Sequence, residues 1–184
     1  MSTRRKVECA AVDFKSEILR TDLVPHEDVL LTRRLPRIKG TYAVLFRCDV
    51  VARIKLGCAG LHTLRPGWHV YIGSAFGGGG VGARVGRYLR RNAKVKWQID
   101  RMKPYLTPHE IWYTLDVEKR ECLWAQAMLD MPRVSYLSHV GSTDCDCKAH
   151  LFVFDKFPAI RTFRVILRRC CPSHDMIRSS RVAA

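Results

Sequence analysis

The chain has 184 residues and a strongly basic composition. Its 32 Lys and Arg residues against 17 Asp and Glu give a formal net charge of +15 and an isoelectric point near 9.9. This length fits one globular domain with extensions, and this charge favours nucleic acid as the partner over an anionic membrane surface. There is no N-terminal signal sequence and no apolar run of 18 residues or more, so we expect a cytoplasmic protein that does not engage a membrane.

The first 39 residues mix basic and acidic side chains and carry no evident chemistry. We interpret 1–39 as an accessory segment with a short helix near residues 13–20. Residues 40–154 form the predicted main domain, and 155–184 form a basic C-terminal extension. In that extension the partial alternation of 160–167 predicts a strand, and fraying is expected beyond Cys171.

Two predicted strands of the main domain each carry a short signature of glycine and tyrosine. Residues 41–48 are rich in strand formers and place Tyr42 on one face, while 68–72 place Tyr71 opposite the apolar residues of that strand. If the strands are neighbours, both phenols reach a common site, although either tyrosine alone reads as a half-buried strand residue. The signatures are Gly40, Thr41, Tyr42 and Tyr71, Ile72, Gly73.

A run of four glycines, 77–80, leads into a predicted arginine-rich helix at 81–91. Four glycines predict a loop, but the lysine of a phosphate-binding loop and the acidic residue of a dinucleotide fingerprint are both missing. On a helical wheel Arg84 lies between the apolar and the basic arcs, beside Tyr88, where its guanidinium can reach a phosphate. A solvated basic face is the alternative interpretation.

Positive charge is concentrated from Arg84 to Lys103, with eight basic residues and one acid, Asp100. We expect this stretch to bind nucleic acid. Trp97 either stacks on an unpaired base or packs in the core, and Asp100 is a salt-bridge partner or a helix cap. The residues expected to bind nucleic acid are Arg87, Arg90, Arg91, Lys94, Lys96 and Trp97.

A second helix, predicted at 118–130, contains one carboxylate at an unusual position. The wheel places Glu121 within an apolar stripe that includes Val117 and Trp124. A glutamate there is costly unless it is paired, protonated or bound to a cation. A partly buried salt bridge is one interpretation; the tyrosines and the arginine favour a second, in which Glu121 is a ligand for Mg²⁺ or Mn²⁺.

Cysteines and a histidine cluster near the end of the main domain. Cys145, Cys147 and His150 are potential soft ligands, and Cys122 or Cys58 is a possible fourth. The spacing is not that of paired CxxC zinc sites, so zinc is not expected. We favour a tight turn whose His150 borders the active site as a general acid or a phosphate contact. A cysteine pair that oxidises reversibly is a third possibility.

These segments together resemble the GIY-YIG nuclease superfamily, over residues 40 to about 154. The resemblance is to a poorly characterised branch with a C-terminal Cys-x-Cys-x-x-His-Leu-Phe motif. The matching segments are Gly40 to Tyr42, Val70 to Ala75, Ala83 to Leu89, Trp97 to Asp100, Glu121 on its helix, and Thr143 to Phe152.

The resemblance implies an α/β fold of the α+β type, with a small, mixed, largely antiparallel sheet of about three to five strands flanked by helices. It implies that Tyr42 deprotonates or positions the attacking water with support from Tyr71, that Arg84 neutralises the phosphate and that Glu121 holds the metal. Two departures from the family pattern are Ser74 and Tyr88.

The function predicted on these grounds is metal-dependent endonuclease activity on phosphodiester bonds of nucleic acid. DNA is the expected substrate, in repair, recombination or the processing of branched structures. The alternative is a non-catalytic nucleic-acid-binding module on the same scaffold, for which the basic residues alone suffice.

Overall fold

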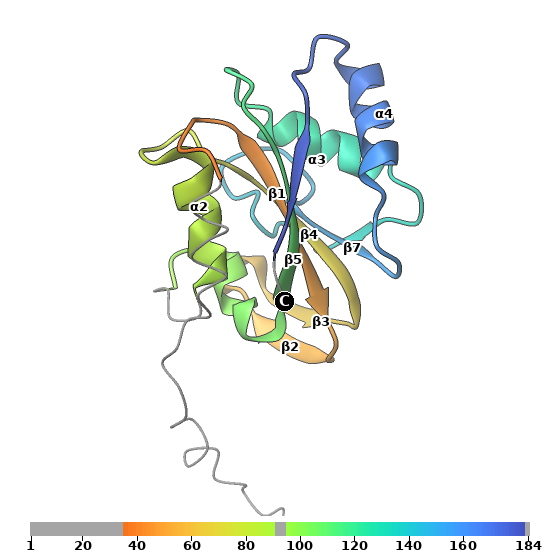
Figure 1. Ribbon diagram of the computed structural model, residues 1–184. Helices are drawn as coiled ribbons and strands as arrows, with labels where there is room; N and C mark the ends of the chain where they lie inside the picture. Colours follow the sequence, from red (N-terminus) through yellow and green to blue (C-terminus); the bar gives the residue numbers. More distant parts are fainter. Residues whose placement is uncertain (1–34, 91–94, 183–184) are drawn as a thin grey trace, which may run out of the picture.

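The computed structural model describes residues 35–90 and 95–182 (Figure 1). The chain forms a central antiparallel sheet with helices on both of its faces. The strands are β1 (Thr41–Cys48), β2 (Ala52–Lys55), β3 (Leu61–Leu64), β4 (Gly67–Ser74), β5 (Thr107–Thr114), β6 (Ser135–Tyr136), β7 (Leu151–Phe154) and β8 (Arg178–Arg181). The α-helices are α2 (Gly80–Leu89), α3 (Glu121–Leu129) and α4 (Ile160–Cys170), with 3-10 helices at Gly57–Ala59, Gln98–Arg101 and Lys103–Tyr105.

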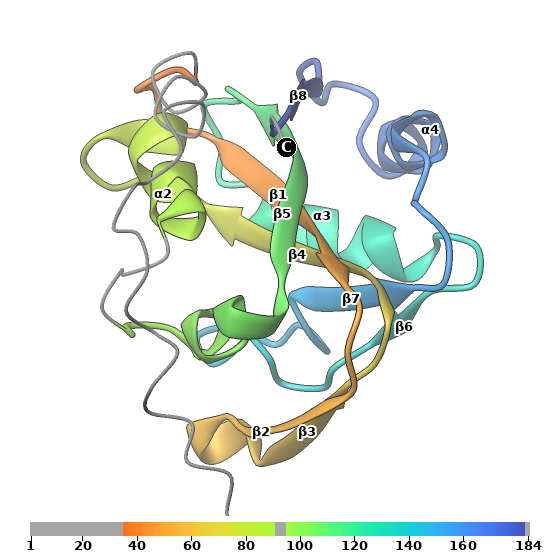
Figure 2. The ribbon, with the colours of Figure 1, turned by 60° about the horizontal axis from the view of Figure 1, so that its bottom comes forward.

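The described strands form one six-stranded sheet in the order β6-β7-β4-β1-β5-β8, with β2 and β3 as a separate hairpin. Every pairing in these sheets is antiparallel. Helix α2 lies on one side of the large sheet, while α3 and α4 lie on the other (Figure 2). The predicted fold class is confirmed.

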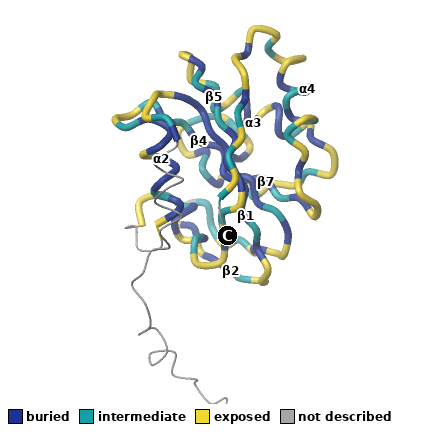
Figure 3. Tube along the Cα trace, viewed as in Figure 1, coloured by how far each residue is buried: buried dark blue, intermediate teal, exposed yellow. Residues whose placement is uncertain are grey.

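The two predicted signature strands are neighbours, which meets the condition for a shared site. In the register of β1 and β4, Tyr42 lies opposite Gly73 and Val44 lies opposite Tyr71. Because side chains alternate across a strand, Tyr42, Val44 and Tyr71 join the core under α2. The residues between them on the two strands join the core under α3 and α4. The sheet is therefore buried on both faces along its centre (Figure 3).

The C-terminal segment differs from its predicted form. Residues 160–170 form helix α4 instead of the predicted strand. Its buried residues are Phe163 and Leu167. The sequence predicts fraying beyond Cys171, but the described chain to Val182 is held in place because β8 pairs with the edge strand β5. Two predictions fall outside the described residues, the short helix at 13–20 and the sites at Arg91 and Lys94. The division of the chain at residues 39 and 154 stays a prediction.

Candidate functional site

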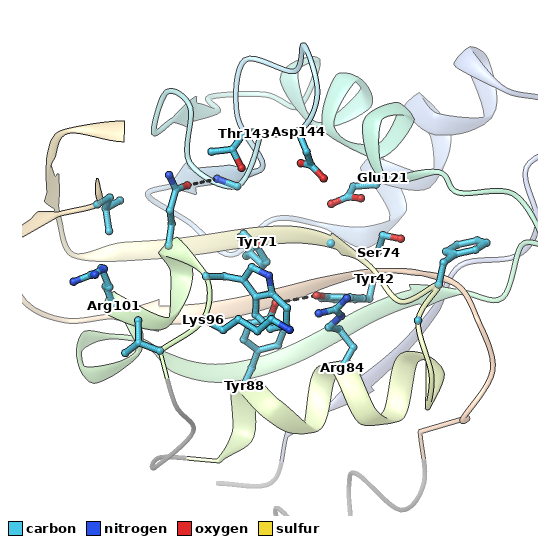
Figure 4. Close-up of a pocket in the computed structure, with 18 of the residues that line it drawn as sticks. Tyr42, Tyr71, Ser74, Arg84, Tyr88, Lys96, Arg101, Glu121, Thr143 and Asp144 are labelled. Carbon is cyan, nitrogen blue, oxygen red and sulfur yellow. Dashed lines mark hydrogen bonds between the residues drawn. The ribbon is translucent and has the colours of Figure 1, made fainter. Parts of the chain in front are cut away.

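A cavity of about 700 Å³ opens beside α2, the adjoining ends of β1 and β4, and the start of α3 (Figure 4). Its lining contains four cationic side chains, Arg84, Lys96, Arg101 and Lys119, and two carboxylates, Glu121 and Asp144. Tyr42, Tyr71 and Tyr88 also line it. The cavity therefore combines excess positive charge with hydroxyl donors, a composition that suits an anionic ligand.

The three tyrosines form one cluster. The hydroxyl oxygens of Tyr42 and Tyr88 lie 2.9 Å apart in a hydrogen bond, and the ring of Tyr88 lies 5.9 Å from that of Tyr42 and 5.8 Å from that of Tyr71. Burial raises the pKa of all three phenols well above the ordinary value, against the weaker opposing effect of Arg84. These hydroxyls stay protonated near neutral pH and are hydrogen-bond donors.

The signature glycines make room for this arrangement. A Cβ on Gly73 would lie in contact with the hydroxyl and ring of Tyr42, the nearest atom at 2.4 Å. A Cβ on Gly40 would lie 2.1 Å from the carbonyl oxygen of Thr114 on the neighbouring strand. Neither position accepts a side chain without movement, so each glycine is explained by close packing at its strand end.

Arg84 is held at the edge of the cavity by an aromatic ring. Its guanidinium carbon lies 4.4 Å from the ring centroid of Trp97, and that of Arg87 lies at the same distance. Arg87 also pairs with Asp100, whose carboxylate accepts hydrogen bonds from the amides of Lys96 and Trp97. Burial raises the pKa of Asp100, but these hydrogen bonds outweigh it and hold the pKa below the usual range. Asp100 is thus both an ion-pair partner and a cap, as expected.

Glu121 lies at a different place on its helix from the one predicted. It is the first residue of α3, and Val117, predicted to share its stripe, is outside the helix and 89% exposed. The amide of Arg120 donates to the Oγ1 of Thr41, which ties the start of α3 to β1. At a helix N-terminus the backbone dipole favours a carboxylate. Trp124, Ala125 and Met128 of the predicted stripe are buried on α3, but Val117 is not part of it, and Glu121 lies at the helix N-terminus instead of in the middle of the stripe. Glu121 lines the same cavity as the tyrosines (Figure 4).

The carboxylate of Glu121 lies close to two nitrogen-bearing side chains. Its Oε2 lies 3.3 Å from the Nζ of Lys119, and its Oε1 lies 3.2 Å from the Nδ1 of His150. His150 itself is only 1% exposed and lies behind Glu121, outside the cavity lining. Glu121 is therefore engaged by protein groups instead of being the centre of a set of hard oxygen ligands.

Three cysteines and one histidine form a cluster with the composition of a metal site. The ligand atoms of Cys122, Cys145, Cys147 and His150 all lie within 4.8 Å of one another. Cys122 supplies the fourth position from the first turn of α3. Three cysteines and a histidine are a zinc ligand set. The expectation of Mg²⁺ or Mn²⁺ with zinc set aside is wrong, because spacing along the chain hid the approach of Cys122 to the loop that carries the other three.

The glycine loop does not present free helix amides. The amide of Val81 donates to the carbonyl of Ile38, and that of Gly82 donates to the carbonyl of Pro36. Gly80 has a φ of 58°, and a Cβ there would lie 2.2 Å from the carbonyl oxygen of Ile38. The glycines serve close packing against residues 36–38, in agreement with the exclusion of a phosphate-binding loop.

The predicted nucleic-acid footprint is placed only in part. Lys96 and Trp97 line the cavity, Arg87 supports Asp100 and Trp97, and Arg90 is exposed just after α2. The prediction omitted Arg101 and Lys119 from the site, although both line the cavity. Arg101 belongs to the same basic stretch, so charge clustering was a usable signal for it; Lys119 is close to Glu121 in the chain but had no comparable signal.

The fold and this site define a mixed α/β protein with a basic tyrosine-lined cavity beside a three-cysteine, one-histidine cluster. A family model described as a domain of unknown function, DUF123, matches residues 41–170, well over half of the chain. The protein belongs to that family. Searches of curated proteins and of solved structures gave no match.

The family match corrects the resemblance to GIY-YIG nucleases, which is wrong: the model that matches is DUF123. The short signatures that carried the resemblance are accounted for by strand pairing and by close approach at Gly40 and Gly73. Among the described residues, no helix combines the length and apolar character needed to cross a bilayer.

Proposed function

We propose that this protein is a nucleic-acid phosphodiester hydrolase whose reaction takes place in the tyrosine-lined cavity. The observation that carries the proposal is the convergence of Arg84 and three protonated tyrosine hydroxyls opposite the carboxylate of Glu121 (Figure 4). Arginine and hydroxyl donors match the oxygens of a phosphodiester, and a facing carboxylate adds the group that pure binding does not need.

Each group has a distinct task in this proposal. Arg84 and the hydroxyls of Tyr42 and Tyr71 donate to the phosphate oxygens and stabilise the charge that grows on them as water attacks. Glu121 accepts one proton from the attacking water. The new bond joins the water oxygen to phosphorus, and the departing ester oxygen leaves with the electron pair of the broken bond and takes a proton from solvent.

The surroundings of the cavity support a polyanionic substrate. Lys96 is exposed at its rim, and Arg101 also lies in the lining. A net charge of +15 favours encounter with nucleic acid over small anions. DNA is the substrate we propose, and the cytoplasm, where thiols remain reduced, is the proposed location.

The test is a cleavage assay on the full chain. Supercoiled plasmid, branched DNA, single strands and RNA are each incubated with and without added divalent cations. We expect cleavage of at least one substrate, lowered about 100-fold or more by Glu121→Gln because the proton acceptor is removed. Binding by this variant, measured by fluorescence anisotropy, should stay within a few fold of wild type.

The matched control is Glu118→Gln, which removes a carboxylate of the same charge that is 67% exposed and pairs with Arg120. This variant should cut at the wild-type rate. If every substrate is bound with a steep salt dependence and none is cut, the protein is a non-catalytic nucleic-acid-binding module. The pairing of Glu121 with Lys119 and His150 is the observation that favours this second function.

A further inference from the structure

We propose that Cys122, Cys145, Cys147 and His150 bind a structural Zn²⁺ ion, and that Glu121 orients the histidine ligand, so that the metal braces one wall of the cavity. The inference rests on the ligand geometry and does not depend on whether the cavity catalyses a reaction.

The donor atoms lie at separations that a tetrahedral zinc site requires. Zinc bonds of about 2.0–2.3 Å place neighbouring ligand atoms about 3.5–3.8 Å apart. The Sγ of Cys145 lies 3.4 Å from the Nε2 of His150, and all four donor atoms fall within 4.8 Å of one another. Small side-chain rotations bring each atom to its position on the tetrahedron. Four protein ligands complete the coordination, which is typical of a structural site rather than a catalytic one.

The two ring nitrogens of His150 face different partners. Its Nε2 faces the sulfur of Cys145, and its Nδ1 faces the Oε1 of Glu121 at 3.2 Å. Histidine ligands of zinc commonly present their second nitrogen to a carboxylate, which fixes the tautomer and the ring orientation. Glu121 occupies that place, and its backbone directly precedes Cys122.

The cluster joins two segments that form the cavity wall. Cys122 lies on α3, whereas Cys145, Cys147 and His150 lie on the irregular segment between β6 and β7. Gly141, Thr143 and Asp144 of that same segment line the cavity. The amide of Gly141 also donates to the Oε1 of Gln98, another lining residue, at 2.7 Å. The segment between β6 and β7 has no regular structure, so metal coordination and this hydrogen bond would hold its cavity-lining residues in place.

The burial and close approach of the cluster fit a bound metal ion. Cys145 and Cys147 are half-buried and His150 is buried, while Cys122 is exposed and provides an entry path for the ion. The donor atoms of the four side chains are directed toward one another. Cysteines bind zinc as thiolates, so a bound ion would take the place of their protons.

The first experiment measures metal on the full chain purified without chelator. Elemental analysis should find about one zinc per chain, and replacement by Co²⁺ should give the visible absorption of a tetrahedral thiolate site. The double variant Cys145→Ser/Cys147→Ser should lose both the zinc and this absorption. Cys170→Ser, which removes an exposed cysteine of α4 outside the cluster, should retain both.

A thiol titration of the folded wild-type protein keeps the test independent of whether the variants fold. The metal-loaded chain should have three fewer reactive thiols than the same chain after the metal is stripped. Three results would contradict the zinc site. They are substoichiometric zinc with no Co²⁺ spectrum, zinc retained by the double variant, and a disulfide among these cysteines.

The role of Glu121 is tested by chelator competition. Glu121→Gln keeps a side-chain oxygen of the same shape beside the Nδ1 of His150, so it should hold zinc with nearly wild-type affinity. Glu121→Ala removes that oxygen and should weaken zinc binding by roughly 10–100-fold. If Glu121→Ala binds zinc as tightly as the wild type, Glu121 does not orient His150. Glu121→Gln should also lose most of its cleavage activity. If this variant is inactive but keeps its full zinc content, the loss of activity is not caused by loss of the metal, so the two proposals are tested separately.

Discussion

The two faces of the central sheet use their side chains in different ways. Under α3 and α4 the aromatic groups are closed against one another: Trp112 stacks on Phe163, and the ring of Trp124 meets Phe163 edge to face. The polar atoms there are paired locally, as in the hydrogen bond from Trp124 Nε1 to His174 Nε2 at 2.8 Å. Under α2 the corresponding aromatic groups are tyrosines whose hydroxyls end at a cavity.

This difference separates stability from function. A core whose few polar atoms are all hydrogen-bonded gains mainly from the burial of apolar surface, at roughly 25 cal/mol per Å². A core that buries three phenols and keeps a cavity beside them gives up part of that gain. We infer that the α3 and α4 face supplies the stability that permits the α2 face to hold a polar site.

The largest expected effect comes from a substitution in the core under α3 and α4, which we call the closed face. Phe163→Ala removes a fully buried ring that contacts both tryptophans and should lower the free energy of unfolding by about 3–5 kcal/mol. Chemical denaturation measures this change. Arg168→Ala, an exposed position on the same helix, should stay within about 0.5 kcal/mol of wild type. A drop in nucleic-acid affinity for folded Phe163→Ala would contradict the separation of the two faces.

The next largest effect is expected on the sheet face under α2, which borders the cavity and which we call the open face. Arg84→Ala removes the cation beside the tyrosines and should lower cleavage about 100-fold or more, with a much smaller change in stability than Phe163→Ala causes. Single-turnover rates and denaturation curves on the same preparation give both values. Arg53→Ala removes the same charge from an exposed position on β2 and is the control. A comparable fall in rate for Arg53→Ala would mean that overall charge, not the cavity, carries the effect.

The smallest effect concerns the rim of the open face. Replacing both Lys96 and Arg101 by glutamine should weaken nucleic-acid binding several fold. The dependence of log affinity on log salt should fall by about 1 for each phosphate that the variant no longer neutralises. Anisotropy titrations over a range of salt concentrations measure that slope. An unchanged slope would place the phosphate-binding side chains on another surface.

Much of the fold was accessible from the sequence because local patterns determine it. Alternation predicted β1 and β4 and the faces on which Tyr42 and Tyr71 lie, and the wheel placed Arg84 beside Tyr88 on α2. Helix α4 was misread as a strand, although Ile160, Phe163 and Leu167 follow the i, i+3, i+7 spacing of a helix. The arginines between them obscured that period.

The site was less accessible because contacts between distant residues complete it. The start of α3 is set by the hydrogen bond from Arg120 to Thr41, 79 positions apart in the chain, which no periodicity records. Cys122 joins Cys145 and Cys147 only after the segment between β6 and β7 folds against α3. Spacing along the chain therefore argued against zinc, while spacing in three dimensions argues for it.

The ring of Trp97 has a consequence for the thermodynamics of binding. Immobilising a long, rotamer-rich side chain on association costs about 0.5–1.5 kcal/mol. Arg84 and Arg87 already lie against this ring in the free protein, so part of their conformational entropy is given up during folding and not at the encounter with a ligand. Ligand binding at Arg84 should therefore carry a smaller entropic penalty than binding at an unsupported surface arginine.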